Sequence, residues 1–264
     1  MGAGLRTVTV IVAAREASSW LPQCLASIIT QSLSSHWRIR ILLGIDACAE
    51  TLATAERFKS SYLTARYFPE HVGPYVIFNS LACSATSDVL VRFDADDVML
   101  NGYLRAQLDR IGSALTPVII QTWSIYVDPD LNPVSARLSD GNFTHRDGRR
   151  QSGSDGQFLM THAVWNRLGS FRPWWCHADT DFLRRAVWSG IVRETIPEYL
   201  YLRRMHSKSL TQSADAGYGS ARRRFYAQQI AEATQRYAAG AIPERLWPAV
   251  ARHFPVERAR RTQD

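Results

Sequence analysis

The chain has 264 residues, of which 46% are hydrophobic, enough to bury one large core or two modest ones. No stretch approaches the run of about 18 apolar residues that a transmembrane helix needs, so we expect no membrane span. The net charge of +7 comes from the last quarter, where eleven arginines and one lysine from Tyr201 onward face five acids. Such asymmetry is typical of contact with an anionic membrane or phosphorylated ligands, and the scarcity of interleaved aromatic residues argues against nucleic acid.

Cysteine usage and the N-terminus predict a cytoplasmic protein. The cysteines are scattered, without the spacing of a zinc site or a disulfide framework; they are Cys24, Cys48, Cys83 and Cys176. The apolar run at residues 7–12 begins almost at once, without the h-region and cleavage site of a signal peptide.

The first hundred residues alternate between strand and helix patterns. Apolar runs predict strands at residues 7–12, 37–45 and 63–68, and helical periodicity follows each of them. The helix after the first strand begins near Ser18 or Ser19, and Gly73-Pro74 precedes a helix over 75–84. Short connections between such elements predict a mostly parallel sheet with helices on both faces.

Residues 89–97, VLVRFDADD, form the most informative stretch. A buried strand is followed by three carboxylates, which need something positive nearby. Mg²⁺ or Mn²⁺ prefers oxygen ligands and usually takes one or two protein carboxylates together with substrate phosphates, so the stretch suggests a metal–diphosphate site. Ligands of α/β sheets bind beyond the carboxyl ends of strands, where these acids lie. The alternative is an acidic helix N-cap.

The second half departs from this alternation. We expect a helix around 104–115, a strand at 118–127 and a polar loop over 138–156. The prediction is one domain of two unequal lobes at 1–217, divided at about residue 100, followed by a basic helical extension at 218–264. The extension is predicted to place three apolar side chains on one face beside Arg222–Arg224, which would suit the inner face of an anionic membrane; they are Phe225, Ile230 and Tyr237.

Five motifs in order resemble those of family 2 glycosyltransferases between about residues 7 and 211. They are VIVAARE at 10–16, Asp46, the Gly73-Pro74 turn with Asn79, FDADD at 93–97, and a C-terminal group comprising GSFRP at 169–173, HADTDFLRR at 177–185 and YLRRMHSKSLT at 201–211. The resemblance implies a GT-A fold, an α/β domain in which a nucleotide-diphosphate sugar gives its sugar to an acceptor hydroxyl with inversion at the anomeric carbon. It makes residues 1–217 the glycosyltransferase domain, with the nucleotide-sugar half at about 1–100 and the acceptor half at 101–217. It also implies Mn²⁺ or Mg²⁺ as cofactor, and a carbohydrate or lipid-linked acceptor.

The resemblance assigns roles to individual residues. It implies Asp96 and His206 as metal ligands and Asp46 as the contact of the nucleotide base. The resemblance at Asp46 favours a UDP-linked donor, with dTDP and GDP donors as alternatives. The other residues that the resemblance places against the nucleotide sugar are Ala13, Glu16, Gly73, Asp94 and Gly156. For Asp46 and Gly73 the alternatives are a helix cap and a loop hinge, and for His206 a surface histidine.

Asp179 is expected to be the general base, because direct displacement needs one carboxylate to take the proton of the acceptor hydroxyl. Asp181, two residues on in the same helix, would face another way and support the helix N-terminus. Trp174 and Trp175 could stack on an acceptor sugar, or simply pack over the core. The loop at 138–156 is a candidate lid over the bound donor.

Several residues depart from the family pattern. Ala13 stands where proline is usual, Ile45 replaces the first of two acids, Phe78 replaces an arginine, and Ala178 replaces the acid before Asp179. These departures leave two other functions open. One is a non-catalytic nucleotide-sugar binding or scaffold module. The other is a sugar-phosphate nucleotidyltransferase, although the glycine-rich loop and basic pair that it needs after the first strand are missing from residues 13–16.

Overall fold

The computed structural model describes residues 5–58, 60–111, 115–137, 143–144, 150–151 and 156–256. Its first half contains β1 (Arg6–Ala14), α1 (Leu21–Ile29), β2 (Trp37–Asp46), α2 (Ala49–Arg57), β3 (Leu63–Phe68), α3 (Pro74–Ala82), β4 (Val89–Asp94), β5 (Val98–Met99), α4 (Tyr103–Leu108) and β6 (Val118–Val127). Its second half contains β7 (Pro133–Arg137), β8 (Phe143–Thr144), β9 (Arg150–Gln151), β10 (Phe158–Thr161), α5 (His162–Leu168), α6 (Ala178–Trp188), β11 (Val192–Arg204), a 3₁₀ turn (Leu210–Gln212), α7 (Ala221–Ala238) and β12 (Phe254–Pro255).

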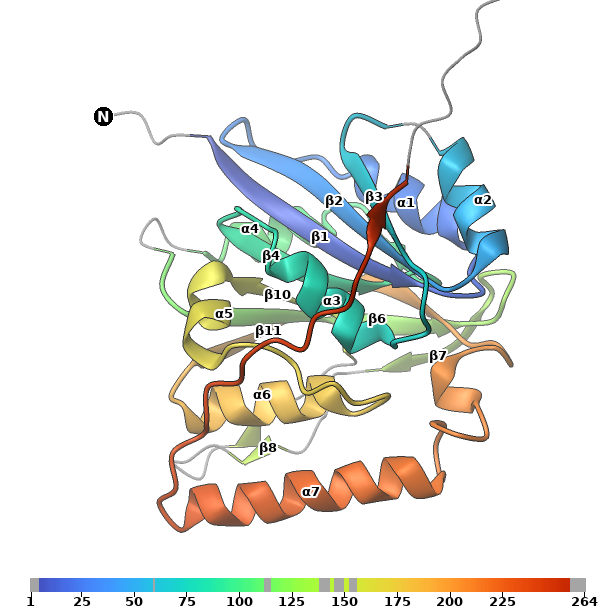
Figure 1. The fold of residues 1–264 in the computed structure, drawn as a ribbon. Helices are drawn as coiled ribbons and strands as arrows, with labels where there is room; N and C mark the ends of the chain where they lie inside the picture. The colour runs from blue at the N-terminus through green and yellow to red at the C-terminus, as the bar shows by residue number, and fades with distance from the viewer. Residues whose placement is uncertain are drawn as a thin grey trace, which may run out of the picture.

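One large sheet forms the centre of the molecule (Figure 1), with the strand order β12-β3-β2-β1-β4-β10-β6-β11-β5 and β7 paired to β6. The neighbours β3, β2, β1 and β4 run parallel, as do β6 and β11. The short strand β10 joins these two parallel groups and is antiparallel to both β4 and β6. The mostly parallel α/β fold expected from the sequence is confirmed.

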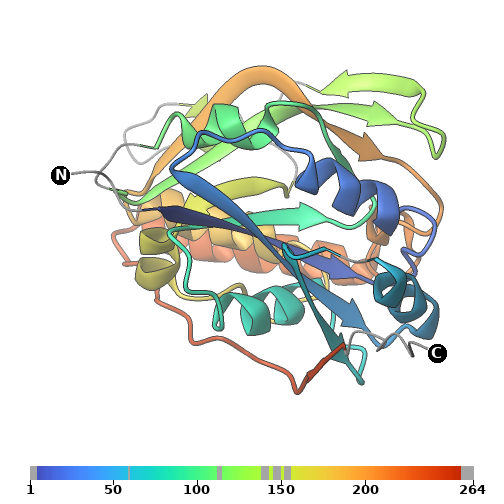
Figure 2. The same ribbon diagram turned by 90° about the horizontal axis from the view of Figure 1, so that it is seen from above.

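Side chains alternate between the two faces of the sheet, and each face has its own apolar core. Val8, Val10 and Val12 of β1 pack in a cluster with residues of α1, α2 and α4. Ile11 points the other way, into a cluster with residues of α3, α5 and α6. Seen from above, the helices lie on both sides of the twisted sheet (Figure 2). The expected coverage of both faces is therefore present.

The predicted element boundaries hold best where the sequence period is clear. The strands expected at 63–68 and 118–127 coincide with β3 and β6. The helix expected over 104–115 is wrong in length, because α4 ends at Leu108. Most of the predicted loop at 138–156 lies outside the described residues, so the expectation of a lid there stays a prediction.

The helix α7 packs on α6, on the side away from the sheet (Figure 1). Its buried side chains are Ile230, Ala233 and Tyr237, and the ring of Tyr237 lies 6.4 Å from that of Trp188 in α6. Phe225, by contrast, is 58% exposed. The prediction that Phe225, Ile230 and Tyr237 share one membrane-facing side is wrong, since five residues turn an α-helix through about 140°.

Residues 239–256, which we call the C-terminal strap, return from α7 across α5 and α3 to the edge of the sheet (Figure 1). Leu246 exchanges backbone hydrogen bonds with the end of α5, donating to Leu168 at 3.0 Å and accepting from Ser170 at 3.1 Å. Farther on, Ala251 N donates to Ser80 Oγ at 3.0 Å, and β12 pairs with β3. The strap therefore connects the end of α5, the helix α3 and the edge strand β3.

We expect Gly169→Ala to loosen the strap. Gly169 has φ +72°, and a Cβ there would overlap the carbonyl oxygen of Leu246. The left-handed backbone and the overlap together should lower the free energy of unfolding by about 1–3 kcal/mol, measured by urea titration. Gly190→Ala is the matched control, because Gly190 has φ +71° and open space around it. Equal losses in the two variants would contradict a role for the Leu246 contact.

Candidate active site

A cavity of about 800 Å³ opens at the carboxyl ends of the parallel strands. The register places Ala13 of β1 directly beside Asp94 of β4, and Ala14 beside Ile45 of β2. Of the residues singled out in the sequence, those that line the cavity are Ala13, Glu16, Asp46, Asp94, Asp96, Gly156, Trp175, Asp179 and His206. Gly73 and Trp174 are not among the lining residues, although Pro74 and Trp175 beside them are. The fold thus gathers segments from all along the chain around one space.

The first wall of the cavity is built on Asp46, the last residue of β2. Its buried carboxylate accepts hydrogen bonds from Val72 N at 2.9 Å and Gly73 N at 3.0 Å, and lies 2.8 Å from His71 Nδ1. Asp46 therefore fixes the turn before α3, and Gly73 belongs to this wall through its N–H. The His71 side chain, 45% exposed, extends from the same turn and lines the cavity.

The acids after β4 form a second wall. Asp94 Oδ1 pairs with Arg92 Nη2 at 3.0 Å, and its Oδ2 accepts from Gln157 Nε2 at 2.9 Å. Asp97 is buried and accepts from the backbone N–H of Arg204 at 2.9 Å and from Gln157. Burial raises the pKa of Asp97 well above its usual range, and the nearby carboxylates of Asp96 and Asp94 add to the rise. Three acids in so small a volume favour a cation beside them.

Beside these acids, Asp96 and His206 are hydrogen-bonded to each other, with Asp96 Oδ2 2.9 Å from His206 Nε2. Two adjacent ligands of an octahedral Mg²⁺ at about 2.1 Å lie about 3 Å apart, so this pair fits one cation. The His206 ring lies against Trp20, with the ring centroids 3.9 Å apart and the planes tilted by 33°, and its Nδ1 has no hydrogen-bond partner within the described part of the chain. Among the described residues, no group of three His, Cys, Asp or Glu side chains converges as in a closed metal site. The pair suits an open site completed by substrate.

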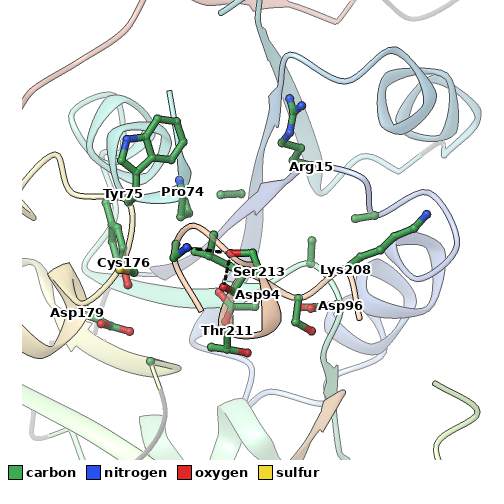
Figure 3. Close-up of a pocket in the computed structure, with 18 of the residues that line it drawn as sticks. Arg15, Pro74, Tyr75, Asp94, Asp96, Cys176, Asp179, Lys208, Thr211 and Ser213 are labelled. Carbon is green, nitrogen blue, oxygen red and sulfur yellow. Dashed lines mark hydrogen bonds between the residues drawn. The ribbon is translucent and has the colours of Figure 1, made fainter. Parts of the chain in front are cut away.

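Asp179 and Asp181 begin the same helix and occupy different environments. Asp179 lines the cavity, opposite Asp94 and Asp96 (Figure 3). Burial raises the pKa of its carboxyl, but the charge of Arg92, the N–H of Thr180 and the hydroxyl of Tyr75 outweigh burial and bring that pKa below its usual value. Asp181 is buried behind the cavity between Arg172 and Arg185, at 3.0 and 2.8 Å. The expected divergence of the two side chains is present.

The two tryptophans also differ in their surroundings. Trp175 contacts the His71 ring edge-on at 4.7 Å, and the guanidinium of Arg222 lies over it at 5.7 Å. Trp174 instead stacks on Tyr226 of α7 at 4.5 Å, with the rings 9° from parallel. Trp175 is thus available to a molecule in the cavity, whereas Trp174 holds α7 against the loop before α6.

Sequence reasoning missed several residues that line or support the cavity. They are His71, Tyr75, Arg92, Gln157 and Arg222. The one signal for Arg92 was a charge inside an otherwise apolar strand, and for Gln157 its place next to Gly156. A Cβ built on Gly156 would overlap both Asp179 Oδ2 and Arg92 Nη1, so a larger residue there would have to displace these two side chains.

Comparison with solved structures supports the fold. TarS residues 1–349 of S. aureus, in complex with UDP-GlcNAc, superposes with a TM-score of 0.70 at 16% identity, over 90% of this chain and 68% of that one. The UDP complex of the same protein gives a TM-score of 0.61 at 14% identity, over 87% and 70% of the two chains.

Comparison by sequence gives the family. No curated protein matches the chain closely enough to count as a relative. The profile described as glycosyl transferase family 2 matches residues 9–175, which is more than half of the chain and includes the walls built on β1, β2 and β4. The chain therefore belongs to glycosyl transferase family 2.

Proposed function

We propose that the protein is an inverting, metal-assisted glycosyltransferase that moves a sugar from a UDP-sugar to an acceptor hydroxyl, with Asp179 as the general base. The observation that carries the proposal is the placement of Asp179 across one cavity from Asp94 and Asp96 (Figure 3). A donor between the two walls would have its diphosphate near the acids of β4 and its anomeric carbon toward α6. Ligands of open α/β sheets bind at this end of the strands.

The donor is proposed to be UDP-linked because solved structures of similar fold were obtained with UDP-GlcNAc and with UDP. The nucleotide would lie along the wall of Ala13, Glu16 and Asp46. Both oxygens of Asp46 already accept hydrogen bonds from the turn at residues 71–73, so we assign Asp46 the task of shaping the base pocket. His71, on that turn and lining the cavity, is the group proposed to contact the base.

Mn²⁺ or Mg²⁺ is the proposed cofactor, held by Asp96 and His206, with Asp94 directed to the sugar nucleotide. A divalent cation there would neutralise the negative charge that the diphosphate gains as it leaves. The chain's own contribution is to hold the two ligands in place, through the contact of Trp20 with the His206 ring and the position of Asp96 just beyond the end of β4.

The reaction requires one proton transfer from the acceptor. As the acceptor oxygen attacks the anomeric carbon, Asp179 takes its proton, and the bond from that carbon to the diphosphate oxygen breaks with its electron pair leaving on UDP. The products are an inverted glycoside, UDP and a protonated Asp179. Because a single carboxylate suffices, Asp181 is free to serve the structure, in its buried contact with Arg172 and Arg185.

The acceptor is proposed to be a carbohydrate or a lipid-linked sugar that reaches Asp179 past Trp175. A flat apolar ring suits the C–H face of a sugar, and Trp175 lines the cavity close to α6. In the part of the chain that the structure describes, no helix is both long enough and apolar enough to cross a membrane. Peripheral contact with an anionic membrane stays a proposal. It now rests on the basic charge of the C-terminal segment alone, because α7 does not present the expected apolar face.

Thermal-shift measurements test the donor and the metal together. We expect UDP and UDP-GlcNAc to raise the melting temperature in the presence of Mn²⁺, because a ligand at one hundred times its Kd adds about 2.7 kcal/mol to the native state. GDP and dTDP compounds serve as comparison ligands. The rise should be smaller in Asp96→Asn. No shift with any nucleotide would contradict the proposed donor site.

The non-catalytic alternative makes a different prediction. A binding or scaffold module would bind UDP-GlcNAc in a calorimeter yet release no UDP, either to water or to a panel of acceptors. UDP release that depends on Asp179 would exclude this alternative.

A further inference from the structure

The general base proposed above has no acidic neighbour before it on its own helix, since Ala178 precedes Asp179. Its first support is local: Thr180 N donates to Asp179 Oδ1 at 2.8 Å. Most of the remaining support comes from elements distant in the sequence, namely β4, through Arg92, and α3, through Tyr75, with a smaller contribution from His177. Much of the control of the charge and position of Asp179 therefore comes from Arg92 and Tyr75, which belong to other elements.

Arg92 is a buried arginine on the central strand β4, with a side chain that is held firmly. Its Nη1 donates to Gly156 O at 2.6 Å and to Gln157 Oε1 at 2.9 Å, and its Nη2 pairs with Asp94 Oδ1 at 3.0 Å. The guanidinium also lies over the ring of Tyr75 at 5.4 Å. A buried charge held by this many partners has little freedom to move.

Gly156 is the point at which Arg92 and Asp179 come together. A single Cβ position on this residue adjoins both Asp179 Oδ2 and Arg92 Nη1. Opposite charges within roughly 4–6 Å favour each other's ionised forms, even without a direct hydrogen bond. Tyr75 completes the arrangement, because its buried hydroxyl interacts with Asp179 while its ring faces Arg92.

We propose that Arg92 is a positioning residue for the general base: clamped by Asp94, Gly156 and Gln157, it keeps Asp179 ionised and directed into the cavity. The inference rests on the proposed function. Because the same guanidinium also binds Asp94, Arg92 couples the wall that holds the donor to the wall that holds the base. The direction in which the pKa of Asp179 departs from its usual value agrees with this role.

Other charged or titratable groups also face Asp179, and the test must separate them from Arg92. They are Tyr75 on α3 and Cys176 and His177 before α6; Arg223 of α7 in turn acts on Cys176 and His177, and Arg222 acts on Cys176. Burial followed by the charge of Arg223 lowers the pKa of His177, so His177 is a weak source of positive charge. Of the groups that lower the pKa of Asp179, Arg92 has the largest effect.

The pH dependence of UDP release from UDP-GlcNAc in Mn²⁺, with water as acceptor, tests the proposal. Asp179 must be ionised to accept a proton, so release falls as pH drops through its pKa. In Arg92→Met the burial of Asp179 is no longer offset by this charge, and we expect release to decline at a pH where the unchanged protein is still fully active. We call the pH below which UDP release declines the acid limit. Arg92→Lys should leave the acid limit low but slow UDP release, because lysine keeps the positive charge without the planar fork of the guanidinium.

A double-variant comparison separates an action through Asp179 from a direct action on the donor. If Arg92 acts through the base, the factor by which Arg92→Met slows release should largely disappear in an Asp179→Asn background. Equal factors in the two backgrounds, or an unchanged pH profile of Arg92→Met, would overturn the proposal. Normal UDP release by Asp179→Asn alone would instead overturn the proposed function.

Two further variants keep the test decisive. Arg193→Met is the matched control: Arg193 is buried, bonds Gln121 and is not among the cavity-lining residues, so the pH profile should not change. Tyr75→Phe keeps the ring beneath Arg92 and removes only the hydroxyl, and should slow release by about tenfold to a hundredfold with an acid limit moved upward. If Arg92→Met fails to fold, an unchanged acid limit in Tyr75→Phe together with full activity in Arg92→Lys would refute the arrangement.

Discussion

Asp179→Asn is expected to slow sugar transfer, and UDP release to water, by about 10²–10⁴-fold. The substitution removes the one carboxylate proposed to take the proton of the attacking hydroxyl, while the amide retains the size and an oxygen that can accept from Thr180 N. The measurement is the initial rate of UDP release at saturating UDP-GlcNAc and Mn²⁺. Binding of the donor, followed by calorimetry, should change far less than the rate, because the loss lies in the chemical step.

The melting temperature of Asp179→Asn gives the control for this loss. Asp179 lines an open cavity and forms no ion pair within 4 Å among the described residues, so the native state should tolerate the amide. A variant that stays folded, binds donor and releases UDP at the unchanged rate would rule out Asp179 as the base.

Asp181→Asn, two residues away, should have the opposite profile. Its carboxylate lies between Arg172 Nε at 3.0 Å and Arg185 Nε at 2.8 Å, and Arg185 is fully buried. Removing one partner of a buried ion pair leaves an uncompensated charge, so the free energy of unfolding should fall by about 3–5 kcal/mol. Urea titration measures the loss. The protein that remains folded should release UDP at close to the original rate.

Glu244→Gln supplies the comparison for that result. Glu244 pairs with the same Arg172 at 2.7 Å, but its side chain is 60% exposed, so the change should cost less than about 1 kcal/mol. If Glu244→Gln and Asp181→Asn lose equal stability, burial is not what makes the Asp181 contacts strong. Severe loss of activity in well-folded Asp181→Asn would point to a catalytic role for this acid.

The sequence predicted the parts of the fold that local patterns determine. Periodic apolar residues located β3 and β6 to the residue, and the acids that end β4 indicated the edge of the sheet at which the cavity opens. The antiparallel strand β10 escaped prediction, because four apolar residues carry no information about strand direction. The path of the C-terminal strap also escaped prediction, because its attachment at Leu246 consists of backbone hydrogen bonds that any residue can make.

The candidate site was predictable where a motif is compact and not where it depends on distant partners. Asp94, Asp96 and Asp179 could be selected from their local motifs, and all three line the cavity. Gln157 could not, since its contacts with Asp94 and Arg92 span more than sixty residues. The burial of Ile230 beside α6, while Phe225 stays exposed, likewise depends on where α7 docks.

Several backbones around the cavity adopt the left-handed conformation without being glycine: Glu16 has φ +51°, Ala47 φ +45° and His177 φ +64°. That conformation costs an L-residue about 1–2 kcal/mol. Glycine would avoid this cost but would lose more conformational entropy on folding, which costs roughly 0.5–1 kcal/mol. The free energy of folding therefore differs little between glycine and the residues present at these positions. A Cβ at these three residues restricts the backbone conformations that the rim of the cavity can adopt, so the cavity should resist deformation even before a substrate binds.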